Sequence, residues 1–195
     1  MATIGLKNLY YAPITEAADG SETYGTPAVL AKAISANIEI DSDVATLYAD
    51  DGADVIIREF TSGTITLGTN NLSGDALEAL IGAKVDENGV LVQCGEDQPK
   101  PVAIGFQAKT AKGGYKYFWL YRVVFGAPGH DLNTKGETIE FATPEIEGTF
   151  TRRNKVDAGG TNHPYMVSID SDETGADAGT ISGWFSAVYE PDYTP

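Results

Sequence analysis

Apolar and polar residues alternate along several short stretches of the chain, and this is the pattern of half-buried β-strands. Between 34 and 40, isoleucine or alanine fills every second position, with serine, asparagine or glutamate between them. In 63–70, Ile65 and Leu67 share the inward face, while Thr64 and Thr66 lie on the opposite, uncharged face. The pattern predicts strands at 4–12, 34–40, 63–70, 90–93, 102–109, 115–125, 136–141, 145–152 and 163–169.

Turn residues separate these strands and set their limits. Pro13 is expected to end the first strand, and the glycine-rich turn at 112–114 joins two strands as a hairpin. Pro144 separates the strand at 136–141 from the one at 145–152.

Two segments have helical rather than strand periodicity. The first begins after Ser73 as the N-cap, carries Leu77 and Leu80 on one face, and stops at Gly82. The second places apolar residues at positions i, i+3, i+4 and i+7, which predicts a C-terminal amphipathic helix with Ile181, Trp184, Phe185 and Val188 on its apolar side.

The segment 41–58 fits neither pattern. Short apolar pieces alternate with carboxylates, and no single core face emerges. We interpret it as a long excursion between two core strands, and such excursions usually have a function or are disordered. Simple disorder does not explain residues such as Leu47, Tyr48 and Ile57, so a surface for another subunit is the better hypothesis.

Composition supports one β-rich domain. The chain has 195 residues, 22 glycines and 10 tyrosines, and only two segments have helical periodicity. This length suits a single domain over 1–195. We predict a mainly β, antiparallel fold with a short helix packed on a sheet and a C-terminal helix.

Charge and cysteine content exclude several classes of protein. The formal net charge is −15, which disfavours nucleic-acid binding because phosphate contacts need clustered lysine and arginine. We expect no secretory signal and no membrane span, and therefore a protein made in the cytoplasm. The single cysteine, Cys94, rules out an intramolecular disulfide.

Candidate chemistry is sparse, and we predict no catalytic, cofactor-binding or metal-binding residues. A nucleophile would need a histidine base, but His130 and His163 both lie in loop-like contexts outside any nucleophile motif. The acidic run 170–175 resembles part of a calcium loop, yet Ile181 stands where the bidentate glutamate belongs. Acidic residues are too numerous for a carboxylate pair to be recognised.

Six pieces of the chain carry a resemblance to a known family: 4–12 (IGLKNLYYA), 24–27 (YGTP), 31–34 (AKAI), 45–51 (ATLYADD), 143–148 (TPEIEG) and the pair Trp184-Phe185. In this order and spacing, over nearly the whole chain, they resemble the major tail proteins, or tail-tube proteins, of siphophages and prophages of Gram-positive bacteria. The resemblance implies a tail-tube fold of two packed antiparallel sheets, sandwich-like or barrel-like, with a flanking helix. Subunits of this family form sixfold rings that stack into a hollow tube for DNA.

The resemblance also implies roles for particular residues. The 41–58 segment would be an arm that reaches the next ring and orders on stacking, with subunit contacts through Asp43, Leu47, Tyr48, Asp50, Asp51, Val55 and Ile57. Thr64 and Thr66 are candidates for the lumen, which should be acidic or small and polar so that DNA passes without specific binding.

The implied setting is the virion tail. The partners would be further copies of the chain, the tape measure, the tail terminator and the distal tail protein. Some relatives carry a C-terminal immunoglobulin-like domain, which this sequence is expected to lack.

Three alternatives remain open from the sequence. A carbohydrate-binding β-sandwich of a phage or bacterial surface device would use the aromatic residues of 115–121 as a sugar platform. A tube protein of a contractile system would share the assembly logic. A small acidic hydrolase would need a catalytic constellation that no motif supplies.

Overall fold

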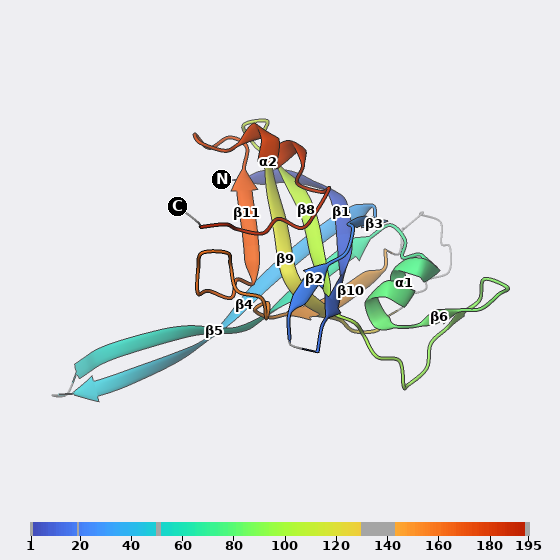
Figure 1. Ribbon diagram of the computed structural model, residues 1–195, viewed down its shortest axis with the longest axis horizontal. Coiled ribbons are helices and arrows are strands. Elements are labelled where there is room, and N and C mark those ends of the chain that lie inside the picture. The colour runs from blue at the N-terminus through green and yellow to red at the C-terminus, as the bar shows by residue number, and fades with distance from the viewer. Residues whose placement is uncertain (1, 19, 50–51, 130–142, 194–195) are drawn as a thin grey trace, which may run out of the picture.

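The computed structural model describes residues 2–18, 20–49, 52–129 and 143–193 (Figure 1). Eleven strands and two short helices make up the described fold. The strands are β1 Thr3–Glu16, β2 Glu22–Tyr24, β3 Ala28–Ala31, β4 Ala33–Ala49, β5 Gly52–Thr69, β6 Lys84–Val85, β7 Leu91–Val92, β8 Val102–Thr110, β9 Tyr115–Phe125, β10 Glu145–Phe150 and β11 Met166–Asp170. The helices are α1 Gly74–Ile81 and α2 Ala178–Ser182.

Nine of these strands form one antiparallel sheet in the order β2-β1-β8-β9-β10-β5-β4. β3 pairs with β1, and β11 pairs with β9, so the sheet branches at both strands. β6 and β7 make a second, two-stranded sheet. The mainly β, antiparallel fold with two short helices that the sequence predicts is confirmed.

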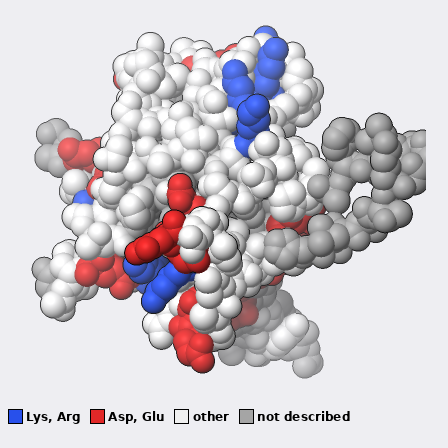
Figure 2. All heavy atoms as spheres, turned by 90° about the vertical axis from the view of Figure 1, so that its right-hand side faces the viewer, with Lys and Arg blue, Asp and Glu red and all other residues white. Residues whose placement is uncertain are grey.

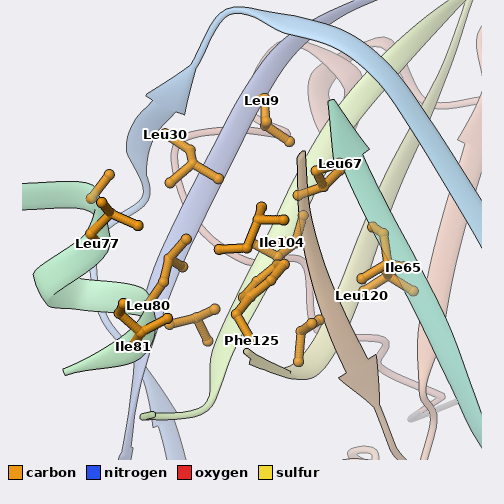
Figure 3. Close-up of a cluster of buried hydrophobic side chains, with 14 of the residues drawn as sticks. Leu9, Leu30, Ile65, Leu67, Leu77, Leu80, Ile81, Ile104, Leu120 and Phe125 are labelled. Atoms are coloured by element: carbon orange, nitrogen blue, oxygen red, sulfur yellow. The ribbon is translucent and has the colours of Figure 1, made fainter. Parts of the chain in front are cut away.

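The main core lies between β1, β5, β8, β9 and β10, and α1 closes one end of it (Figure 3). Leu77, Leu80 and Ile81 of α1 point from the helix toward Ile104 and Phe125 of the sheet. Because the burial of each such side chain contributes roughly 1.5–3 kcal/mol, this cluster is the principal source of stability.

A second apolar cluster covers the opposite face of β1, β8 and β9. Trp119 and Tyr121 of β9 are fully buried there beneath the C-terminal segment. The Trp119 indole donates a hydrogen bond to the carbonyl of Trp184 over 3.0 Å, and the Tyr121 hydroxyl donates to Tyr189 over 2.8 Å. Gly105 makes room for the indole, since a Cβ there would lie 2.7 Å from the Trp119 ring.

Several local predictions are confirmed. Ser73 caps α1 by accepting a hydrogen bond from the backbone of Ala76, and Gly82 ends it in the left-handed conformation with φ of 75°. The hairpin turn between β8 and β9 contains Gly113 with φ of 104°. Asp177, which was not singled out from the sequence, caps α2 by accepting from the Thr180 backbone over 2.6 Å.

Two boundary predictions are wrong. β1 continues through Pro13, which pairs with Val102 while its carbonyl accepts a hydrogen bond from Gly25. Proline lacks the backbone N–H that a strand normally donates, but at this position the strand continues without it. The C-terminal helix ends at Ser182, because Gly183 follows and the chain then turns to pack Trp184 beneath it.

The predicted strand at 136–141 lies outside the described residues. Within the described ranges, none of the helices has the length and apolar content needed to cross a bilayer.

Candidate functional site: a projecting apolar arm

A two-stranded hairpin extends from the body of the molecule, at the lower left of Figure 1. We call this hairpin, residues 41–62, the arm. β10 pairs with β5 only from Gly63 to Gly68, so beyond that point β4 and β5 pair with each other alone. The excursion predicted between two core strands is thus built from the extended ends of β4 and β5, which pair with each other. That it orders only on stacking stays a prediction.

Phe60 anchors the base of the arm. Its ring stacks on Tyr165 with 4.1 Å between centroids, and its carbonyl accepts a hydrogen bond from Arg152 over 2.7 Å. Phe150 lies on the same ring stack, at 6.2 Å from Phe60. The base of the arm is therefore packed against the domain, whereas the rest of the arm projects.

The arm exposes apolar side chains that a monomer leaves unburied. Tyr48 is 72% exposed and Ile57 is 60% exposed. The arm also exposes four other large apolar side chains: Val44, Leu47, Val55 and Ile56. Isolated exposed apolar residues are common, but contiguous groups of them mark interaction surfaces. At roughly 25 cal/mol per Å², covering them would supply a substantial driving force for association.

The pairing register brings four of the predicted contact residues to one face. Ala45 lies opposite Ile57, Leu47 opposite Val55, and Asp43 opposite Glu59. Directly paired residues point to the same side of a hairpin, so these six residues form one face. We call it the acid-flanked face, because two carboxylates follow its apolar strip toward the base.

Tyr48 lies nearer the tip, past a register shift after Leu47. The predicted contacts Asp50 and Asp51 lie outside the described residues.

Sequence reasoning missed the opposite face of the arm. Val44 pairs with Arg58 there, and Thr46 pairs with Ile56. Two-residue alternation applied separately to each strand would have revealed both faces. The alternation was obscured because neither face is buried, so apolar residues occur at odd and even positions alike.

The second predicted set, Thr64 and Thr66, lies on the outer face of β5, opposite the buried Ile65 and Leu67. Thr64 is flanked by Glu39 and Thr149, and Thr66 by Asn37 and Glu147. This outer surface of β4, β5 and β10 is small, polar or acidic at the registered positions Ser35, Asn37, Glu39, Thr64, Thr66, Gly68, Glu145, Glu147 and Thr149.

The residues considered for catalysis and metal binding do not come together. Cys94 is exposed, and its backbone N–H donates to Asp97 over 2.7 Å. His163 hydrogen-bonds through Nδ1 to the carbonyl of Arg153 over 3.1 Å. His130 lies outside the described residues. Within the described ranges, no three metal-ligating side chains converge.

Most of the aromatic residues proposed as a sugar platform are packed against other side chains of the protein. Trp119 and Tyr121 are fully buried under the C-terminal segment, and Phe118 stacks on Phe106 at 5.1 Å. Tyr117 contacts Phe185, at 6.1 Å between centroids. Trp119, Tyr121 and Tyr117 pack in the second apolar cluster, and Phe118 packs against the main core.

Comparison with family models and with curated proteins gives no match to this chain. Functional inference therefore rests on the arm, the polar outer face and the resemblance of short sequence pieces described above.

Proposed function

We propose that this protein is a structural subunit that assembles with copies of itself into stacked sixfold rings, forming a phage tail tube. The observation that carries the proposal is the projecting arm with exposed apolar side chains on both faces. An enzyme or a monomeric binding module has no evident need for such a structure, whereas a subunit that must reach a neighbour does.

The energetics of the arm favour association. A two-stranded hairpin standing alone in water is only marginally stable, because it buries little apolar surface. Its outer edges also present unpaired backbone groups, which are an aggregation hazard in a monomer. A neighbouring subunit would remove both problems by covering the apolar side chains and the edges.

The outer face of β4, β5 and β10 supplies a suitable lumen. None of its registered residues is basic, and Glu39, Glu145 and Glu147 carry negative charge. A tube lined in this way would repel DNA phosphates and would let the genome pass without being held. We propose that Thr64 and Thr66 face this lumen, in a virion tail that also contains tape-measure, terminator and distal tail proteins.

Shortening the arm tests this proposal. Replacing residues 44–58 with an Asn-Gly turn joins Asp43 to Glu59, keeps the Phe60 anchor, and uses a turn favoured in two-residue hairpins. We expect the native protein to form large particles in light scattering at high concentration, and the shortened protein to stay monomeric and folded by circular dichroism.

A matched control removes exposed apolar residues elsewhere. Val90 and Val92 are 55% and 46% exposed and lie outside the arm, so Val90→Ser with Val92→Ser should leave assembly unchanged. Assembly of the arm-shortened protein at the native concentration would contradict the proposal.

A further inference from the structure

A trough runs along the N-terminal half of β1. One part is a groove of about 370 Å³ between β1 and β4, lined by apolar residues including Leu6, Ile34, Ala36 and Phe118. A second groove of about 350 Å³ continues between β1 and β3, and Leu6 lines both. The two grooves together are called the β1 trough.

The trough is open because the sheet does not close there. Among the described strands, β4 pairs with β5 alone, and β1 pairs with β3 from Leu9 to Tyr11. Within the described residues, the first part of β1 therefore pairs on one side alone, with β8. Apolar side chains at the trough remain partly in water, including Ile34 at 51% exposed and Val29 at 64%.

The charge of the trough is opposite to that of the whole protein. Lys32 lines it, and the Lys116 ammonium lies 5.5 Å from the centre of the Phe118 ring on its wall. Lys7 also lines it, but its ammonium lies over the Tyr115 ring at 4.4 Å, on the opposite face of β1 from Leu6. No aspartate or glutamate is among the described residues that line either groove, although the chain has 28 acidic residues. Figure 2 shows one group of basic side chains at the upper end of the molecule and a second group lower down that lies against acidic side chains.

The acid-flanked face of the arm has the complementary character. Leu47, Val55 and Ile57 make an apolar strip, and Asp43 and Glu59 lie directly opposite each other beside it. Like charges in this cross-strand position are destabilising. Among the described residues, an ion pair forms at Glu59, with Arg152 at 3.5 Å, and none forms at Asp43. The other face carries Arg58, which lysines would repel.

We propose that the β1 trough of one copy receives the acid-flanked face of the arm of a second copy. Leu47, Val55 and Ile57 cover the apolar walls, and Asp43 and Glu59 lie near Lys32 and Lys116. This contact is heterologous, because two different surfaces meet, so it propagates from copy to copy. The inference rests on the proposed self-assembly and identifies which surface receives the arm.

A charge exchange tests the contact directly. One variant carries Lys32→Glu and Lys116→Glu, and the other carries Asp43→Lys and Glu59→Lys. Alone, each variant presents an arm and a trough of the same charge, so we expect the concentration needed for assembly to rise at least about tenfold. Mixed in equal amounts, every arm meets a trough of opposite charge, and light scattering should recover particles of native size.

Two matched pairs of variants test the apolar part. Ile57→Ser on the acid-flanked face should weaken assembly about tenfold or more, whereas Ile56→Ser on the opposite face should not. Ile34→Glu within the trough should weaken it, whereas Ile40→Glu should not, since Ile40 is on the same strand and 50% exposed but does not line the trough. Circular dichroism melts check that every variant is folded.

The outcomes separate this inference from the proposed function. Native assembly that is lost on shortening the arm, but is unaffected by both charge variants and by Ile34→Glu, overturns the trough as the receiving surface and leaves self-assembly standing. Equal effects of Ile57→Ser and Ile56→Ser overturn the choice of face. Native protein that stays monomeric at every concentration overturns both proposals.

Discussion

Arg153 is a fully buried charged side chain, held between the second apolar cluster and the C-terminal segment. It forms an ion pair with the buried Asp157, and its guanidinium lies 4.6 Å from the centre of the Tyr121 ring. Burial opposes the charge, but the neighbouring Tyr24, Tyr121 and Asp157 outweigh it and raise the pKa of Arg153. Burial also raises the pKa values of both phenols, so they stay neutral.

Removing one partner of this pair should be costly. Asp157→Ala leaves the buried guanidinium with only the more distant Glu190 carboxylate, at 3.8 Å, and we expect a loss of about 3–5 kcal/mol in the free energy of unfolding. Lys155→Ala is the control, because its ion pair with Glu190 is more than a third exposed on both sides and contributes about 0–1 kcal/mol. Urea denaturation measures both, and equal losses would show that Arg153 does not depend on Asp157.

Helix α1 covers one end of the main core, and the Ser73 side chain caps its N-terminus. Ser73→Ala removes the oxygen that accepts from the Ala76 backbone over 3.2 Å, and should cost about 1 kcal/mol. Ser73→Asp keeps an acceptor there and should restore stability. Thermal melts compare the two, and an unchanged melting temperature for Ser73→Ala would mean that packing alone fixes the helix start.

Elements with local signals could be predicted from the sequence. The cap and stop of α1 and the glycine turn of the β8–β9 hairpin depend on residues close in sequence, so pattern reasoning placed them well. The end of α2 has a local signal in Gly183 and also a distant contact, because the Trp184 carbonyl that follows accepts a hydrogen bond from the Trp119 indole. Nothing near Trp184 in sequence reports that contact.

The arm was predicted as a surface but not as a structure. Its contact residues Asp43, Leu47, Val55 and Ile57 were chosen because apolar and acidic residues coincide there, and the hairpin register then places them on one face. The β1 trough could not be predicted, because it arises from strands far apart in the chain that approach without pairing.

At the scale of the whole molecule, charge and apolar surface are unevenly distributed. A net charge of −15 makes copies repel one another at long range, although salt screens this beyond about 8–10 Å. A lysine-lined trough without acidic residues is therefore a local exception that can select the approach of an acidic arm. Each subunit therefore has one surface that inserts, the arm, and a different surface that receives, the β1 trough, as an open, repeating assembly requires.

Negative-stain electron microscopy of the concentrated native protein tests self-assembly into a tube most directly. The account predicts rings, or hollow tubes of uniform diameter, with a stain-filled lumen and a regular axial repeat. Dispersed monomers at every concentration, or solid aggregates without a lumen, would contradict it.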